Sequence, residues 1–236
     1  MSTVNVLIIF VKNPEAGFVK TRLADSIGGR SAAFLYSLFA EAVFARTEDS
    51  RYVRIVFYRP AERQKEIKAW VGKGIEIEPQ EGDDLGSIMF NGFSLAFRKG
   101  AKRVIAIGTD SPLIDNETIS KAFKALEDSR CVIGPSLDGG YYLLGLSRPH
   151  KGIFKKISWG TDRVFGETLD NLKKLKIKYD VLDTGIDIDR VEDLVGLKER
   201  LQKMDNKALK GLFPILEALE KILSCDRLTK TGVHEI

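Results

Sequence analysis

An apolar run that ends in a basic, glycine-containing loop opens the sequence and constrains the fold more than any other segment. Residues 4–10 read VNVLIIF, which predicts a buried strand. The loop that follows carries five residues expected to bind the ligand: Lys12, Gly17, Lys20, Thr21 and Arg22. Ligands of open α/β sheets bind outside the carboxyl ends of the strands, so this loop predicts an anion site. The phosphates of a nucleotide are the expected anion.

The residue types in this loop suit a phosphate. Gly17 lets the backbone approach the oxygens, and Lys20 and Arg22 carry the charge that neutralises them. The spacing is neither that of the Walker P-loop nor that of the G-x-G-x-x-G dinucleotide pattern. A solvated turn with three surface cations is the alternative interpretation.

Strand and helix patterns alternate along the rest of the chain. Strands are predicted over residues 4–10, 52–58, 74–78, 103–107, 131–135, 141–146 and 177–182. Helices are predicted over residues 31–47, 61–71, 85–99, 116–127, 162–174, 191–204 and 209–223, with Ser31 and Asp115 as expected N-caps. This alternation predicts a three-layer α/β/α fold with a Rossmann-like, mostly parallel sheet. The pair of strands in 131–146 is expected to form a hairpin inserted late in the chain.

Composition limits the classes of protein to consider. The apolar fraction is 44% and the charged fraction is 30%, as in ordinary globular domains. The net charge of +4 comes without a basic block, and the first apolar run is too short to cross a bilayer. We therefore expect neither a nucleic acid nor a membrane as partner. Two isolated cysteines, Cys131 and Cys225, favour the reducing cytoplasm and no disulfide.

No shift in composition divides the chain sharply. The simplest organisation is a catalytic domain over residues 1–204, followed by a C-terminal helical extension and flexible tail over 205–236. The apolar face expected in 209–223 could pack on the same chain or on a second copy, which leaves a homodimer open.

A single carboxylate follows the apolar strand 103–107, in the sequence Gly108-Thr109-Asp110-Ser111-Pro112. Asp110 is expected at the same sheet edge as the first loop, where it could hold Mg²⁺ together with substrate phosphates. It could instead cap the following helix or a turn before Pro112. Asp115 is the better cap for the next helix, which favours the metal role for Asp110.

Two further carboxylates, Asp187 and Asp189, stand two residues apart in an extended segment and so face the same way. They could complete a metal site with Asp110. The alternative is that Asp189 caps the helix that begins near Val191. The sequence does not decide which of the two would bind the metal.

Two loops are candidates for an acceptor pocket. The first contains Asp138, Gly139, Gly140 and Tyr141, and the second contains Trp159, Gly160 and Thr161. Their glycines would leave room for a bound molecule and Trp159 would form a wall. The alternatives are a hairpin turn with core aromatics and a core tryptophan beside a capping Thr161.

Other catalytic mechanisms find little support in the sequence. His150 and His234 are the only histidines and lie in polar segments, so neither a Ser-His-Asp triad nor a histidine zinc site is expected. The sequence has no C-x-x-C and no G-x-S-x-G motif.

Taken together and in order, the motifs resemble those of a known superfamily. FVKNPEAGFVKTRLA, GTDSP, GPSLDGGYYLLGL, SWGTDRVFGETL and DIDRVEDL are similar to those of a branch of the glycosyltransferase-A superfamily whose members are assigned as nucleotide-diphospho-sugar transferases. That branch is similar in turn to phospholactate guanylyltransferase and to the molybdenum-cofactor nucleotidyltransferases. The resemblance extends from about Val4 to Leu197.

The resemblance implies a role for each motif. It implies that Lys12, Gly17, Lys20 and Arg22 form the nucleotide phosphate loop and that Asp110, Asp187 and Asp189 form the metal site. It also implies that residues 138–141 and 159–161 face the second substrate.

We therefore expect an Mg²⁺- or Mn²⁺-dependent transferase. The first choice is nucleotidyl transfer from a nucleoside triphosphate to a small anionic acceptor, with Lys20, Arg22 and Asp110 as catalytic residues. The alternative is glycosyl transfer from a nucleotide sugar, in which Asp138 could act as base. A non-catalytic nucleotide-binding module is the third possibility.

Overall fold

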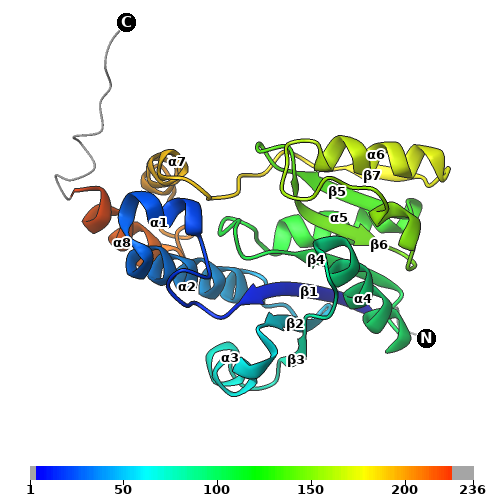
Figure 1. The fold of residues 1–236 in the computed structure, drawn as a ribbon, viewed down its shortest axis with the longest axis horizontal. Coiled ribbons are helices and arrows are strands. Elements are labelled where there is room, and N and C mark those ends of the chain that lie inside the picture. Colours follow the sequence, from blue (N-terminus) through cyan, green and yellow to red (C-terminus); the bar gives the residue numbers. More distant parts are fainter. Residues whose placement is uncertain (1–3, 225–236) are drawn as a thin grey trace, which may run out of the picture.

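A seven-stranded sheet forms the centre of the protein (Figure 1), whose computed structural model describes residues 4–224. In chain order the strands are β1 (Asn5–Lys12), β2 (Val53–Arg59), β3 (Glu76–Pro79), β4 (Arg103–Ile107), β5 (Cys131–Pro135), β6 (Tyr141–Leu146) and β7 (Tyr179–Val181). Their order across the sheet is β3-β2-β1-β4-β6-β5-β7. All neighbours are parallel except those of β6, which runs antiparallel to both β4 and β5. The predicted α/β fold is thus confirmed.

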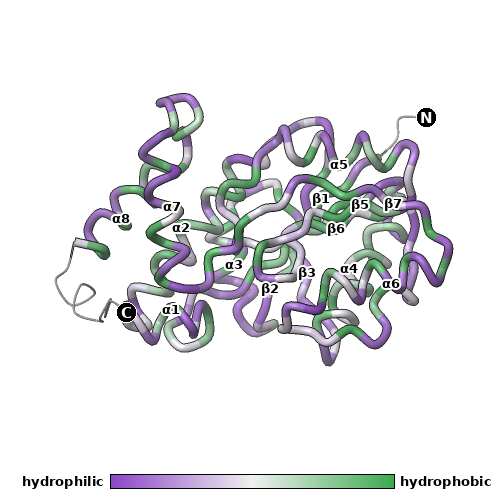
Figure 2. The backbone as a smooth tube through the Cα atoms, turned by 90° about the horizontal axis from the view of Figure 1, so that it is seen from above, coloured by the Kyte–Doolittle hydropathy of each residue, from purple (hydrophilic) through white to green (hydrophobic). Residues whose placement is uncertain are grey.

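Helices cover both faces of this sheet. They are α1 (Thr21–Ile27), α2 (Gly29–Arg46), α3 (Gln64–Val71), α4 (Leu85–Arg98), α5 (Asn116–Asp128), α6 (Val164–Lys174), α7 (Val191–Gln202) and α8 (Phe213–Leu223). Short 3₁₀ turns lie at Ala61–Arg63 and Lys151–Phe154. One core cluster contains residues of α2, α3 and α5, and the other contains residues of α4 and α6. Because the inner strands are covered on both faces, their sequences are mostly apolar, and the tube is mainly green around β5 and β6 (Figure 2).

The hairpin of β5 and β6 is built into the sheet instead of lying at its edge. β6 lies between β4 and β5, with Ile107 opposite Leu143. Since β6 runs against β4, the first residues of β6 lie where β4 ends. Tyr141 and Tyr142 therefore reach the edge at which the parallel strands β1, β2 and β4 have their carboxyl ends.

A third apolar cluster lies beyond that edge and joins the beginning of the chain to its end. Leu23 of α1 and Phe39 of α2 pack there with Leu197 of α7 and with Ile215 and Leu219 of α8. The apolar face of α8 thus packs on its own chain. The division of the chain at residue 204 remains a prediction, and the expected flexible tail lies outside the described residues from position 225 onward.

Three local predictions differ from the structure. Residues 21–27, expected in a loop, form the short helix α1, whose seven residues are too few to display a clear period. The next helix begins at Gly29 after Gly28, so Ser31 lies inside its first turn and does not cap it. The last helix begins at Phe213 with Pro214 in its first turn, not at residue 209.

Among residues 4–224, none of the helices has both the length and the apolar character required of a bilayer-spanning segment.

Gly145 offers a test of how tightly β6 is packed. A methyl group at this position would lie 2.5 Å from Cγ1 of Val132 and 3.1 Å from Cδ1 of Leu126. We expect Gly145→Ala to lower the free energy of unfolding by about 1–3 kcal/mol through overpacking, measured by urea denaturation. Gly166→Ala on α6 is the control, because no atom lies within 4 Å of the added methyl. Equal stabilities of the two variants would contradict this account of β6.

Candidate active site

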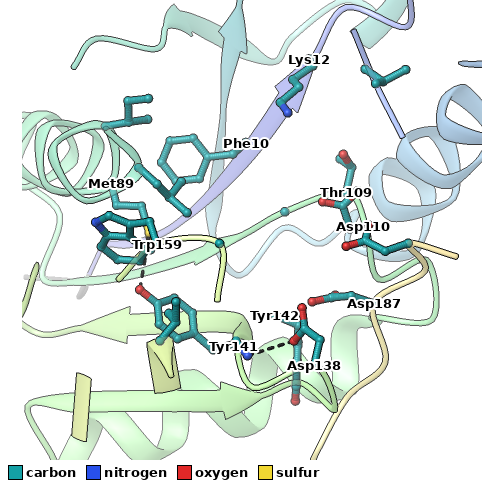
Figure 3. Close-up of a pocket in the computed structure, with 18 of the residues that line it drawn as sticks. Phe10, Lys12, Met89, Thr109, Asp110, Asp138, Tyr141, Tyr142, Trp159 and Asp187 are labelled. Atoms are coloured by element: carbon teal, nitrogen blue, oxygen red, sulfur yellow. Dashed lines mark hydrogen bonds between the residues drawn. The ribbon is translucent and has the colours of Figure 1, made fainter. Parts of the chain in front are cut away.

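A cleft of about 1020 Å³ opens at the carboxyl edge of β1, β2 and β4 (Figure 3). Most of the residues predicted as site residues line it: Lys12, Lys20, Thr21, Arg22, Asp110, Asp138, Gly140, Tyr141, Trp159, Gly160, Thr161, Asp187 and Asp189. Gly17 and Gly139 do not line it. The cleft therefore brings together motifs from the beginning, the middle and the end of the chain.

Lys20 occupies the centre of the charged end of the cleft. It precedes α1 with a left-handed backbone (φ 48°), a conformation that non-glycine residues seldom adopt. Its side chain is only 2% exposed, and Nζ pairs with Oδ1 of Asp110 and, at 2.9 Å, with Oδ1 of Asp189. Burial alone would lower the pKa of Lys20, but the two carboxylates raise it above its ordinary value. The lysine is therefore a fixed cation inside an acidic cluster.

The capping alternatives for the aspartates are decided by the hydrogen bonds at the two helix starts. Asp115 caps α5 by accepting from the backbone N–H of Thr118 at 2.9 Å, as predicted, so Asp110 does not cap this helix. At α7, the N-cap is Arg190, and Asp193 accepts from the backbone N–H groups of Asp189 and Arg190. The carboxylates of Asp110 and Asp189 are thus both available to the cleft.

Asp187 is the most buried of the three carboxylates. Burial raises its pKa to about 6; a hydrogen bond from Ser111 opposes this effect, and repulsion from Asp110 and Asp138 adds to it. The backbone N–H of Ile188 donates to the carbonyl of Asp110 at 3.0 Å, which ties the late segment to the loop after β4. These contacts hold like charges close together, an arrangement that favours a bound cation.

The first loop contributes its cations unequally. The Arg22 side chain is 58% exposed, and its Nη1 lies 3.8 Å from Oδ2 of Asp189. Lys12 is the last residue of β1, where its backbone N–H donates to the Tyr36 hydroxyl at 2.7 Å. Gly17 has a positive φ of 85° and serves the turn itself, which explains its place outside the cleft.

The opposite end of the cleft is apolar and aromatic. Phe10, Met89, Tyr141 and Trp159 gather there (Figure 3), and the Tyr141 hydroxyl donates to Sδ of Met89 at 3.7 Å. Trp159 rests on Gly86, where a methyl group would lie 2.8 Å from the indole Cζ2. Because Gly86 has no side chain, the first turn of α4 leaves space for the indole ring of Trp159.

The two predicted acceptor loops are locked against each other. The backbone N–H of Phe165 donates to the carbonyl of Gly139 at 2.9 Å, and Gly139 lies so close to Asp162 that no side chain fits there. The Asp138 carboxylate accepts from Oγ of Ser136 and from the backbone N–H of Gly140. Gly139 therefore supports the pocket without lining it, and the Asp138 carboxylate stabilises its own turn.

Several lining residues were not predicted from the sequence. Four of them follow β3 at the same edge of the sheet: Gln80, Gly82, Asp83 and Asp84. Their position after a predicted strand could have identified them as lining residues. Tyr36, Arg59, Tyr142 and Arg190 also line the cleft. Tyr36 on α2 links the ends of two strands, since its hydroxyl accepts from Lys12 and from Oγ1 of Thr109 at 3.0 Å. No sequence pattern marks such a link, because it depends on how α2 crosses the sheet.

The carboxylates fit a hard divalent cation in pairs. No group of three or more His, Cys, Asp or Glu side chains within residues 4–224 is placed to hold a metal by itself. Mg²⁺ binds proteins through one or two carboxylates and completes its shell with substrate phosphates and water. Asp110 with Asp187 or Asp189 offers this donor set beside the cationic loop.

Comparison with solved structures reveals one clear relative and several distant ones. A protein from Desulfovibrio desulfuricans G20, whose proposed activity is nucleotide-diphospho-sugar transfer, is 29% identical, with a TM-score of 0.85 over 93% of this chain and 98% of that one. This likeness confirms the resemblance stated from the motifs.

Two more distant structures share the fold. The 4-diphosphocytidyl-2C-methyl-D-erythritol synthase of Anaerococcus prevotii is 14% identical, with a TM-score of 0.56 over 86% of this chain and 97% of that one. A cytidylyltransferase from Leptospira borgpetersenii is also 14% identical, with a TM-score of 0.52 over the full length of both chains.

No functionally curated protein matches the sequence. A family model does match, over residues 42–161, which is just over half of the chain and includes Asp110, residues 138–141 and residues 159–161. The chain therefore belongs to the family described as "Uncharacterized protein conserved in bacteria (DUF2064)".

Proposed function

We propose that this protein is an Mg²⁺- or Mn²⁺-dependent nucleotidyltransferase. The observation that carries the proposal is the charged end of the cleft, where Lys20 and Arg22 adjoin Asp110, Asp187 and Asp189. The fold shared with two cytidylyltransferase-type enzymes supports the same chemistry. An oxygen of a small anionic acceptor attacks the α-phosphorus of a nucleoside triphosphate, the bond to the bridging oxygen breaks, and pyrophosphate leaves.

The chain's own residues would act by position and charge. Lys20 and Arg22 reach the phosphates, and Asp110 with Asp187 or Asp189 would hold the cation. A bound divalent cation supplies charge neutralisation at the phosphate oxygens. Such a reaction requires no protein nucleophile, and in-line transfer depends mainly on orientation and electrostatic stabilisation. The aromatic end of the cleft, together with residues 138–141 and 159–161, offers the second substrate a preformed wall.

Glycosyl transfer from a nucleotide sugar is the second candidate function. The proposed activity of the Desulfovibrio relative favours it. Asp138, the candidate base for such a reaction, already accepts two hydrogen bonds within its own turn, which favours nucleotidyl transfer instead. A nucleotide-binding module without catalysis is the third candidate.

Thermal unfolding separates these candidates, because a ligand that binds only the native state raises its stability. We expect a nucleoside triphosphate with Mg²⁺ to raise Tm and UDP- or GDP-sugars to have little effect. Release of pyrophosphate in a screen of phosphorylated acceptors would then establish the reaction. Stabilisation by nucleotide sugars alone would favour glycosyl transfer, and stabilisation without turnover in either screen would favour the binding module.

Asp110→Asn tests the cation site. The variant keeps the shape of the side chain but loses its charge, so we expect pyrophosphate release to fall by about 10²–10³-fold. The stabilisation by a triphosphate that depends on Mg²⁺ should fall with it. Asp115→Asn is the matched control, because asparagine caps a helix as well as aspartate does. Full activity of Asp110→Asn would refute the metal assignment.

Lys20→Met tests the buried lysine as counter-ion of Asp110 and Asp189. Exposed pairs contribute up to about 1 kcal/mol and buried ones about 3–5 kcal/mol when one partner is removed, so we expect a loss of roughly 2 kcal/mol in urea denaturation. Mg²⁺ should restore more stability to this variant than to the wild type. The control is Lys12→Met, since Lys12 lines the same cleft and takes part in no ion pair among residues 4–224. An identical response of Lys20→Met and wild type to Mg²⁺ would contradict the role.

Arg22→Ala tests the exposed cation of the first loop. We expect the Kd for a nucleoside triphosphate with Mg²⁺ to rise about tenfold, the effect of losing one charge-assisted hydrogen bond, measured by isothermal titration calorimetry. Arg30→Ala, at the start of α2 and outside the cleft, should leave Kd unchanged. Equal affinities of the two variants would remove Arg22 from the phosphate site.

A further inference from the structure

We infer that Tyr142 is a positioning residue for the acidic segment 183–189. Its ring fixes this segment on the sheet, so that the carboxylates of Asp187 and Asp189 face Asp110. The inference rests on the proposed function, because it assigns Tyr142 a task in the cation site of the same cleft.

The Tyr142 ring packs against two glycines. A methyl group on Gly134 of β5 would lie 2.5 Å from the ring atom Cζ, and one on Gly185 would lie 2.6 Å from Cε1. Neither glycine has a positive φ, so the absence of a side chain serves the ring and not the backbone conformation. The ring thus contacts both main chains directly, and it couples β5 to the acidic segment.

Main-chain hydrogen bonds hold the same segment at three points. The N–H groups of Leu182 and Gly185 donate to the carbonyls of Ile133 and Pro135, each at 2.8 Å, and the N–H of Ile188 donates to the carbonyl of Asp110 at 3.0 Å. The Tyr142 hydroxyl adds a bond of 3.2 Å to the carbonyl of Asp183. Gly185 is therefore the point where the segment leaves β5 and crosses to Asp110, and the ring lies at that point.

The charges on this segment explain why a rigid support is needed. Asp187 lies near Asp110 and Asp138, and both carboxylates repel it, while Lys20 attracts it more weakly. Figure 3 shows Tyr142 beside Asp138 and Asp187 on the wall of the cleft. A segment with such a charge would relax away from Asp110 if its packing allowed. The Tyr142 ring, which packs against Gly134 and Gly185, opposes that relaxation.

Tyr142 could instead be an ordinary core residue, since it belongs to the same apolar cluster as Tyr52. Tyr52 is a matched control: it is 7% exposed against 9% for Tyr142, and its hydroxyl also donates to a backbone carbonyl, that of Thr47. It does not line the cleft. Tyr52→Leu and Tyr142→Leu therefore remove the same phenol group from the same apolar cluster. Only Tyr142→Leu removes it next to the acidic segment 183–189.

Amide hydrogen exchange of the full chain tests the positioning role without any ligand. We expect Tyr142→Leu to speed exchange at Gly185 and Ile188 at least tenfold relative to Ile8 of β1, which reports global unfolding. Tyr52→Leu should speed all three amides equally. Tyr142→Phe keeps the ring but loses the hydroxyl bond to Asp183, so it should speed exchange at Gly185 and Ile188 much less than Tyr142→Leu. Unchanged protection at Gly185 and Ile188 in Tyr142→Leu would overturn the inference.

Gly185→Ala gives an independent perturbation of the same contact, and it decides the question if Tyr142→Leu does not fold. Its methyl group displaces the ring, so exchange at Ile188 should accelerate. The double variant Gly185→Ala/Tyr142→Leu should be no worse than the more affected single variant, because the ring that clashes is gone. Additive effects in the double variant would count against the contact.

Binding of Mn²⁺ alone, followed by electron paramagnetic resonance, separates this inference from the proposed function. We expect Tyr142→Leu to weaken Mn²⁺ binding about tenfold and Tyr52→Leu to leave it unchanged. A wild type that binds no Mn²⁺ would refute the cation site, while the exchange data would still decide the role of Tyr142. Wild-type binding retained in Tyr142→Leu would overturn the inference and leave the cation site intact.

Discussion

The architecture of the cleft depends on one buried ammonium group. Lys20 joins the first loop to Asp110 and Asp189, and without its charge the acidic segments would repel one another across the cleft. The sequence presents this lysine as a group for binding phosphates, whereas the structure also makes it the resident partner of the carboxylates. At the proposed cation site, a divalent cation would compete with Lys20 for the same oxygens, and the phosphates of the proposed nucleotide would offer the lysine an alternative partner.

Close contacts at glycines hold the rest of the site in place. Gly86 contacts Trp159, Gly139 contacts Asp162, and Gly185 contacts Tyr142. In each case two segments distant in sequence approach to a distance that a side chain would prevent. The motifs rich in glycine thus owe their composition mainly to contacts between loops.

The sequence predicts the sheet, most of its helices and part of the lining of the cleft, because each depends on local pattern or on strand polarity. Asp110 could be placed from the end of its strand, and Asp115 from its cap position. The place of β6 between β4 and β5 could not be predicted, since the sequence of a hairpin does not indicate which strand it pairs with. The same holds for the contact of Lys20 with Asp189 and for the link through Tyr36, which depend on tertiary packing.

The span of the Lys20 to Asp189 contact has a consequence for synthesis of the protein. The two residues are 169 positions apart, so the charged end of the cleft closes only after Asp189 has left the ribosome. Contacts of such long range form late, because the entropy of loop closure precedes any gain in energy. A nascent chain can assemble β1, β2 and β4 early, yet Lys20 remains without one of its two carboxylates until α7 emerges. Topology alone thus leaves the charged end of the cleft incomplete in shorter nascent chains.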